Sequence, residues 1–181
     1  MGNQNKKDKL YFSREEMFEL NKAKLLERGV TIESIAKITY NQQSKYNDHV
    51  DMKVCIESVE KILSFREIFH VVQLSIDIDK LTEAKAFSQP IQSIMENDLG
   101  MFGVDELFGL SIASLYGTIG QTNFGDIDVN KPGIVKDLND KGKGGKPECH
   151  TFLDDVVGAL AAAASTRVAQ VMSDGTAKKE D

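Results

Sequence analysis

One stretch near the end of the chain decides the fold, and it reads Thr151-Phe-Leu-Asp-Asp-Val-Val-Gly-Ala-Leu-Ala-Ala-Ala-Ala-Ser165. Two adjacent carboxylates, Asp154 and Asp155, are followed by small and apolar residues that are typical of a buried helix. Small residues recur at four-residue spacing along one side of this helix, at Gly158, Ala162 and Thr166. Because that side carries little side chain, another backbone can come close to it. The sequence therefore predicts a buried helix that leaves the packed core at an acidic N-terminus, a suitable place for a metal ion.

The acid pair also has a purely structural explanation. Thr151 and Asp154 fit the two ends of a capping box, in which each side chain bonds the backbone of the other residue. Acids in a first turn also stabilise a helix through its dipole, typically by ~0.3–1 kcal/mol. Both explanations stay open on this stretch alone.

A second acid pair upstream favours a shared site. Val104-Asp-Glu-Leu-Phe-Gly109 places Asp105 and Glu106 ahead of a glycine at the same spacing as the first pair. Small residues again recur every four positions, at Gly109, Ala113 and Gly117. Roughly thirty residues connect the two predicted helices, and at up to ~3.3 Å each they can return the chain to its starting end. We therefore expect both acidic N-termini to face one cleft.

The composition is that of one globular domain. The chain has 181 residues, a net charge of −6 and 41% hydrophobic residues. This length can bury a substantial core, and the negative charge argues against a broad surface for nucleic acid. We expect one domain over residues 13–172, a disordered N-terminal tail over residues 1–12 and a loose C-terminal tail over residues 173–181.

The expected location follows from the cysteines and the short apolar runs. Cys55 and Cys149 show no paired spacing, and we find no secretory leader, so we expect free thiols in a cytoplasmic protein. The longest uncharged apolar run, Val156 to Ala164, has about half of the ~20 residues that cross a membrane. We therefore expect at most a peripheral contact with a membrane.

Caps and apolar stripes predict an all-α protein, a bundle in which a central helix is surrounded by others. Ser13, Thr31, Asp51 and Ser64 are the expected helix caps. The helix expected over residues 68–87 has apolar residues on most sides, so we place it centrally. From Gln121 to His150 we expect mostly turns, with a short helix around Pro132 to Leu138. The other helices are expected over residues 13–28, 31–46, 51–63, 91–97 and 104–117.

Four carboxylates gathered in one cleft would need a cation. Asp105, Glu106, Asp154 and Asp155 would repel one another by about 4 kcal/mol per pair, at ~4 Å and an effective dielectric of 20. A bound cation or retained protons would relieve this repulsion. An all-oxygen set without Cys or His suits Mg²⁺, with Mn²⁺ or Ca²⁺ as alternatives. Since Mg²⁺ on carboxylates usually keeps water and phosphate oxygens as further ligands, the set indicates hydrolysis of a phosphate ester.

Residues near these acids are candidates for contact with phosphate. Asp128 and Lys131 lie between the two acid-led helices and could supply another metal ligand and a phosphate contact, although surface charge is the commoner meaning of such residues. A basic loop precedes the second acid-led helix and carries three lysines, Lys141, Lys143 and Lys146. We expect this loop at the mouth of the cleft, where it would attract phosphate esters.

Three segments of the chain resemble the phosphatidylglycerophosphatase A family. They are Val104-Asp-Glu-Leu-Phe-Gly109, Asp128-Val-Asn-Lys-Pro132 and Leu153-Asp-Asp-Val-Val-Gly158. From about Leu25 to Val168 the chain is similar to the soluble, Gram-positive branch of this family. The resemblance implies an all-helical bundle and a Mg²⁺-dependent phosphatase that converts phosphatidylglycerophosphate into phosphatidylglycerol.

The resemblance also implies roles for individual residues. It makes Asp105, Glu106, Asp128, Asp154 and Asp155 the metal and catalytic candidates, and we expect the two adjacent pairs among them to be catalytic. The partner that we expect is a phospholipid head group or a small phosphate ester, bound by a homo-oligomer that binds no nucleic acid.

Two other functions stay open from the residues alone. An all-α nucleotide pyrophosphohydrolase would also use carboxylates on helices. A non-catalytic oligomeric scaffold would use the same acids as caps or as ligands of a structural cation. Replacing Asp155 by Asn separates the classes, because an enzyme would lose turnover and keep its fold.

Overall fold

The structure, a computed structural model, describes residues 9–141 and 148–180. Most of the expected N-terminal tail lies outside these residues, as do Lys143 and Lys146 of the basic loop. The described residues form helices without any strand, which confirms the all-α class. The elements are α1 (Arg14–Glu27), α2 (Ile32–Gln43), α3 (Met52–Leu63), α4 (Arg66–Glu83), α5 (Ile91–Glu96), α6 (Val104–Ala113), η1 (Ser114–Tyr116), α7 (Gly117–Asn130), α8 (Ile134–Lys141) and α9 (Leu153–Glu180).

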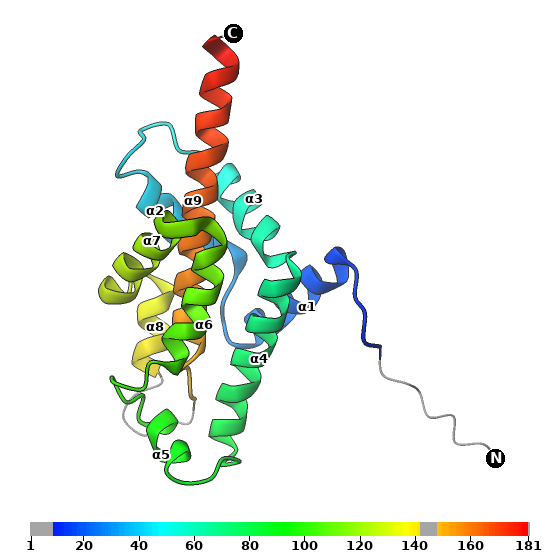
Figure 1. Cartoon of the computed structure of the whole chain (residues 1–181), viewed down its shortest axis with the longest axis vertical. Coiled ribbons are helices and arrows are strands. Elements are labelled where there is room, and N and C mark those ends of the chain that lie inside the picture. Colours follow the sequence, from blue (N-terminus) through cyan, green and yellow to red (C-terminus); the bar gives the residue numbers. More distant parts are fainter. Residues whose placement is uncertain (1–8, 142–147, 181) are drawn as a thin grey trace, which may run out of the picture.

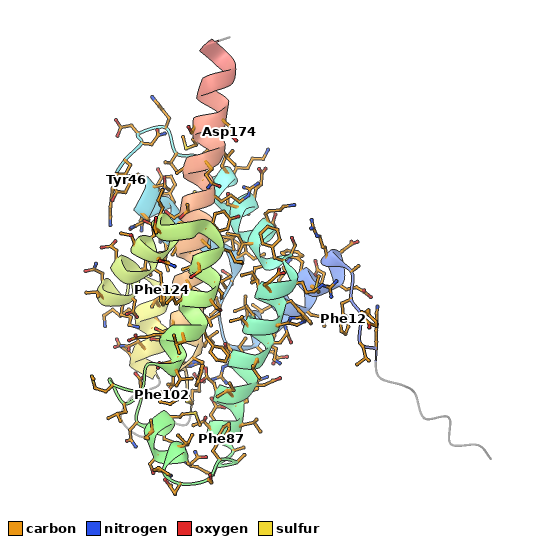
Figure 2. The ribbon with its side chains drawn as sticks, in the orientation of Figure 1. Phe12, Tyr46, Phe87, Phe102, Phe124 and Asp174 are labelled. Carbon is orange, nitrogen blue, oxygen red and sulfur yellow. The ribbon has the colours of Figure 1, made fainter. Side chains whose placement is uncertain are left out.

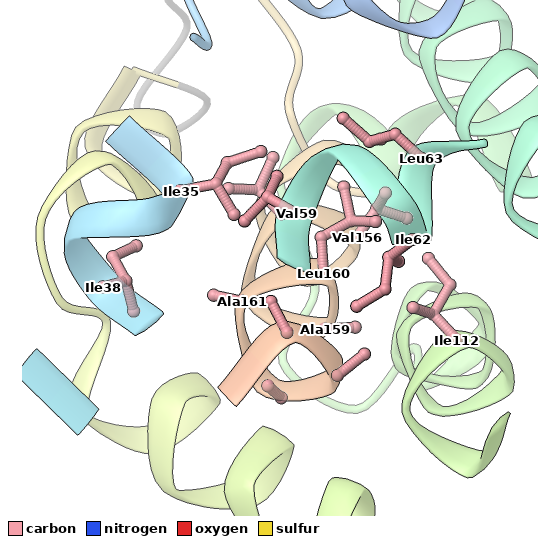
Figure 3. Packing of buried hydrophobic residues seen from close by; sticks show 14 of the residues in the cluster. Ile35, Ile38, Val59, Ile62, Leu63, Ile112, Val156, Ala159, Leu160 and Ala161 are labelled. Atoms are coloured by element: carbon pink, nitrogen blue, oxygen red, sulfur yellow. The ribbon is translucent and has the colours of Figure 1, made fainter. Parts of the chain in front are cut away.

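Helix α9 is the centre of the bundle. Every residue from Thr151 to Thr166 is buried, and α2, α3, α4, α6, α7 and α8 all contact this helix. In Figure 1 it runs upward through the other helices, in orange and red. Because the side chain of each alanine is only a methyl group, neighbouring helices can approach α9 closely on every side. Figure 3 shows side chains from the surrounding helices packed around it, among them Ile35, Val59, Ile62 and Ile112.

Helix α4 is not central, which corrects the expectation for residues 68–87. Its inner face buries Ile68, Val72 and Ile76, but Leu74 and Leu81 are 53% and 46% exposed. Helix α9 is central because its small side chains let other helices pack on all of its sides. The large apolar side chains of α4 are buried on one face of the helix only.

The expected caps hold at three of the four positions. Ser13 and Thr31 form capping boxes, and the Asp51 side chain accepts a hydrogen bond from the backbone of Lys53. Helix α4 instead begins after Phe65 without a side-chain cap. The Ser64 hydroxyl donates back to the Lys61 carbonyl at the end of α3, so it is not available to cap α4.

Helix α7 occupies a region where the sequence analysis expects turns, and it decides where the site forms. Its glycines, Asn and Asp lower helix propensity, yet Phe124 and Ile127 are buried, and α7 packs on α9. This tertiary packing outweighs local propensity. Gly117 has φ 65°, and it ends the short turn η1 so that α7 can start. The chain thereby returns toward the end of the bundle where α6 began (Figure 1).

The C-terminal part of α9 also differs from the expected loose tail. The helix continues to Glu180, past Met172, where the predicted domain ends. Ser173 and Asp174 are exposed, and Figure 2 shows Asp174 where α9 extends beyond the bundle. Once a helix is nucleated, each further residue adds a backbone hydrogen bond, so α9 propagates past its core contacts.

One helix of the described chain is long and apolar enough to pass a test for membrane-spanning segments. It covers Leu153–Gly175 of α9 with a mean hydropathy of 1.3, and 67% of the tested window is buried inside the protein. Burial of this kind is the pattern of a core helix.

Candidate functional site

The N-terminus of α9 is held by Asp79 of α4. Its two carboxylate oxygens accept hydrogen bonds from the backbone N–H groups of Phe152 and Leu153, at 3.1 and 3.0 Å. Burial raises the pKa of Asp79 well above its usual range, and these two hydrogen bonds oppose that effect. The Thr151 hydroxyl donates to the Met95 carbonyl at 2.7 Å instead of capping the helix. The cap of α9 therefore comes from another helix.

This cap leaves Asp154 free for a different role. The capping box that would have paired it with Thr151 is not the arrangement observed, because the Thr151 hydroxyl is engaged elsewhere. The carboxylate of Asp154 accepts from the backbone N–H of Asp155 at 3.0 Å and from the Lys131 ammonium. The acid pair thus points to chemistry at the helix end rather than to capping.

Both acid pairs face one cleft of about 190 Å³. Helices α6, α7, α8 and α9 and the loop before α6 all contribute to its walls. The lining residues are Asp98, Leu99, Gly100, Gly103, Asp105, Glu106, Asp128, Lys131, Asn139, Asp154 and Asp155. The structure therefore brings together all five acids that the sequence analysis selected, from three helices.

Two glycines let the helices around this cleft pack closely. A Cβ atom on Gly109 of α6 would lie 3.2 Å from the Asp155 carbonyl oxygen and 2.5 Å from the ring of Phe124. The expected close approach of α6 to α9 is therefore present at Gly109. Gly158 of α9 instead faces α7 and α8, since its added Cβ would be 3.3 Å from Ile127. The ring of Phe124 lies near both glycines, so the small-residue sides of α6 and α9 do not pack directly on each other at Gly158.

The first acid pair starts α6 without help from a side-chain cap. Gly103 precedes the helix in the left-handed region, with φ 65°. Asp105 is only 7% exposed, and its carboxylate accepts from the Glu106 backbone N–H at 2.9 Å. Burial raises the pKa of Asp105, and that hydrogen bond opposes the effect.

Lys131 lies among the acids rather than on the surface. Its ammonium donates to Asp128 at 2.6 Å, to Asp154 at 3.0 Å and to Asp155 at 3.2 Å. Burial acts to lower the pKa of Lys131, but the charges of Asp154 and Asp155 and the bond to Asp128 raise it more. Lys131 is therefore a permanent cation inside the cleft.

One lysine does not balance the buried acids. Burial raises the pKa of Asp154 to about 6, against the pull of Lys131. Burial, and then the charge of Asp154, raise the pKa of Asp155 to about 9. The two neighbouring carboxyls therefore titrate as a pair, and the pair retains a proton more readily than an exposed acid does. A cluster of acids that retains a proton in this way also attracts a further positive charge, such as a metal ion.

Among the described residues, no group of three or more His, Cys, Asp or Glu side chains is already arranged around a metal position. The Lys131 ammonium is instead the common partner of Asp128, Asp154 and Asp155. The donor set still fits a hard divalent cation, because it consists of carboxylate oxygens in a polar cleft.

Sequence reasoning missed two polar side chains of the cleft and the residue that caps α9. Asp98 sits in a turn before α6 with φ 46°, and Asn139 belongs to α8. Nothing in their local sequence marks them as site residues. Asp79 carried a usable signal, since it shares the buried stripe of α4 with Val72 and Ile76, where a charged residue needs a partner. The side chain of Lys141 is outside the described structure, as are Lys143 and Lys146.

Comparison with known proteins now identifies the family. A model of the family Phosphatidylglycerophosphatase A matches residues 30–170. The chain belongs to this family. The match covers all six acids that line the cleft and Lys131, and it agrees with the resemblance drawn from the three sequence segments.

Similar proteins of known structure share the fold. YpjQ of Bacillus subtilis (strain 168), an uncharacterized protein, is 45% identical over 163 residues, covering 90% of each chain. Its crystal structure has a TM-score of 0.83 and covers 90% of this chain and 99% of that one, at 44% identity. The low temperature requirement C protein from Listeria monocytogenes has a TM-score of 0.82 at 41% identity, covering 87% and 97% of the two chains. A protein of unknown function from Bacillus stearothermophilus gives 0.80 at 47% identity, covering 85% and 94%.

Proposed function

We propose that this protein is a cytoplasmic, divalent-metal-dependent phosphatase that hydrolyses a phosphate monoester, with phosphatidylglycerophosphate as the substrate and phosphatidylglycerol as the product. The observation that carries this proposal is the single cleft onto which both acid-led helices open. Family membership supports the reaction class and the phospholipid head group. The carboxylate cluster supports a metal.

The metal that fits best is Mg²⁺, with Mn²⁺ or Ca²⁺ as alternatives. The residues that would hold it are Asp105, Glu106, Asp128, Asp154 and Asp155, all of which line the cleft. Such a cation, when bound, neutralises phosphate charge and lowers the pKa of a bound water molecule.

The chain itself supplies positioning and charge. Gly109 keeps the start of α6 close to the start of α9, so the two acid pairs stay on one cleft. Asp79 fixes the first turn of α9 and with it the direction of Asp154 and Asp155. Lys131 is the described cation in the cleft lining, and it is the candidate to contact a phosphate oxygen.

A lipid substrate also requires the cleft to reach a membrane surface. Leu99 lines the cleft and is exposed, and the segment that follows it carries further exposed apolar side chains. Met101 is 91% exposed and Leu107 is 61% exposed, with Val104 between them. We propose that this apolar rim touches the membrane reversibly while the head group enters the cleft.

Phosphate release over a substrate panel tests the proposal. Phosphatidylglycerophosphate in mixed micelles, glycerol 3-phosphate and a nucleoside triphosphate would each be assayed with Mg²⁺ and with EDTA. We expect Mg²⁺-dependent release of inorganic phosphate, fastest from the lipid. Faster release of pyrophosphate from the nucleotide would favour a pyrophosphohydrolase. No release from any substrate would favour the non-catalytic scaffold.

A further inference from the structure

Lys131 uses its whole hydrogen-bonding capacity inside the acid cluster. An ammonium group has three N–H donors and no acceptor. Three carboxylates, those of Asp128, Asp154 and Asp155, accept from the Lys131 ammonium at 2.6–3.2 Å. In this arrangement Lys131 has no donor left for a phosphate oxygen. Its contact with substrate therefore requires a second arrangement.

The backbone around Lys131 fixes the start of this side chain. Lys131 ends α7 in the left-handed region, at φ 42°, and its N–H donates to the Ile127 carbonyl at 2.8 Å. A left-handed conformation is unfavourable for a residue with a side chain. The C-terminus of a helix also attracts a cation. The strained backbone of Lys131 thus places its ammonium within hydrogen-bonding distance of all three acids.

A divalent cation would compete with this ammonium. Asp154 and Asp155 are both more than 90% shielded from solvent, with side chains 6% and 5% exposed. One oxygen of Asp154 already accepts from the Asp155 N–H and the other accepts from Lys131. A metal that binds these oxygens would lie next to the ammonium, and two cations at such a distance repel strongly in a poorly hydrated site.

We propose that Lys131 is an internal counter-ion: it holds Asp128, Asp154 and Asp155 together when no metal is bound, and metal binding displaces its ammonium. The inference rests on the metal dependence of the proposed function. Displacement frees N–H donors beside the cleft, where a phosphate group can accept them. The lysine therefore positions the metal ligands before the metal binds and is released to the anion afterwards.

Lys131→Met tests the competition, with Mg²⁺ alone as the probe. Removing the ammonium should strengthen Mg²⁺ binding by about tenfold, which corresponds to ~1.4 kcal/mol of relieved competition. The same variant should melt at a lower temperature in EDTA, because the three acids then lack their counter-ion. Calorimetric titration and thermal melting measure the two effects. Lys136→Met is the matched control, since Lys136 is exposed and pairs with Asp140 on α8.

A measurement on the unchanged protein does not depend on how well the variant folds. Amine acylation read by mass spectrometry should increase at Lys131 when Mg²⁺ is added and stay constant at Lys136. Equal Mg²⁺ affinity in the wild type and Lys131→Met, including no binding to either, would overturn the proposal. So would unchanged acylation of Lys131 at a Mg²⁺ concentration that stabilises the protein. These readouts need no substrate, so they stand even if the phosphatase assay fails.

Discussion

At the scale of single residues, Asp155 contributes to the pH dependence of the metal-free protein, in the same direction as Asp79, Asp105 and Asp154. Its folded-state pKa of about 9 lies far above the usual value of 3.8, chiefly because of burial. The folded protein therefore binds more protons than the unfolded chain between these pH values, and its stability must fall as the pH rises through this window. Each pKa unit corresponds to ~1.4 kcal/mol.

The first prediction replaces this carboxyl by an amide of the same shape. In EDTA, Asp155→Asn should reduce the fall of the melting temperature between pH 5 and pH 8, because the amide does not ionise while the other buried acids still do. Added Mg²⁺ should raise the melting temperature of the wild type and have a smaller effect on the variant. Thermal melts over this pH range, with and without Mg²⁺, measure both. Parallel pH profiles for the two proteins would show that Asp155 does not carry this dependence.

The sequence predicted the cleft acids but not their hydrogen bonds. Asp105, Glu106, Asp154 and Asp155 were visible because they repeat one spacing ahead of a glycine. The bonds from Lys131 to three acids join residues on α7 and α9, and no local pattern encodes them. Asp79 caps a helix more than seventy positions away for the same reason.

At the scale of helices, Gly109 and Phe124 set the distance between α6 and α9. Gly109→Ala would place a Cβ atom 2.5 Å from the buried Phe124 ring and 3.2 Å from the Asp155 carbonyl oxygen. We expect overpacking to destabilise the protein by ~1–3 kcal/mol. Chemical denaturation measures this change.

Gly125→Ala on α7 provides the control for that prediction. Its added Cβ meets nothing within 4 Å, so the gain in helix propensity should leave the protein equally stable or up to ~1 kcal/mol more stable. Equal losses in the two variants would mean that the helices do not depend on close packing at Gly109.

Helix boundaries were predictable where local signals exist and not where packing decides. Capping boxes at Ser13 and Thr31 gave the starts of α1 and α2. Helix α7 was missed because its glycines, Asn and Asp resemble a turn, while its stability comes from Phe124 and Ile127 packed inside the bundle.

At the scale of the whole molecule, the apolar rim predicts how the substrate is reached. Leu107→Gln should raise the apparent KM for phosphatidylglycerophosphate in micelles and leave hydrolysis of a soluble phosphate ester unchanged, since only the lipid needs the surface contact. Leu26→Gln on α1 is the control, because Leu26 is also exposed but belongs to a helix that contributes no residue to the cleft lining, whereas α6 contributes Asp105 and Glu106. An equal effect on both substrates would show that Leu107 supports the folded structure and does not act through contact with a membrane.

The architecture was predictable at this scale, and the assembly is not yet tested. The sequence predicted that the alanine-rich helix is buried, but it placed the helix over residues 68–87 at the centre of the bundle, a position that α9 occupies. The expected homo-oligomer stays a prediction that light scattering on the purified protein would check. Association depends on exposed residues, and these show no sequence pattern comparable to the apolar stripe of a buried helix.

The most direct test of the metal-dependent phosphatase is turnover of phosphatidylglycerophosphate by Asp154→Asn, measured as phosphate release in Mg²⁺. Asp137→Asn, an exposed acid on α8, is the matched control. We expect Asp154→Asn to lose ~100-fold or more in turnover, as is usual when a charged group is removed from a catalytic site, while its circular dichroism stays unchanged. The control should keep full activity. Full turnover by Asp154→Asn, or equal turnover by the wild type in EDTA, would contradict the assignment of the cleft as a metal-dependent active site.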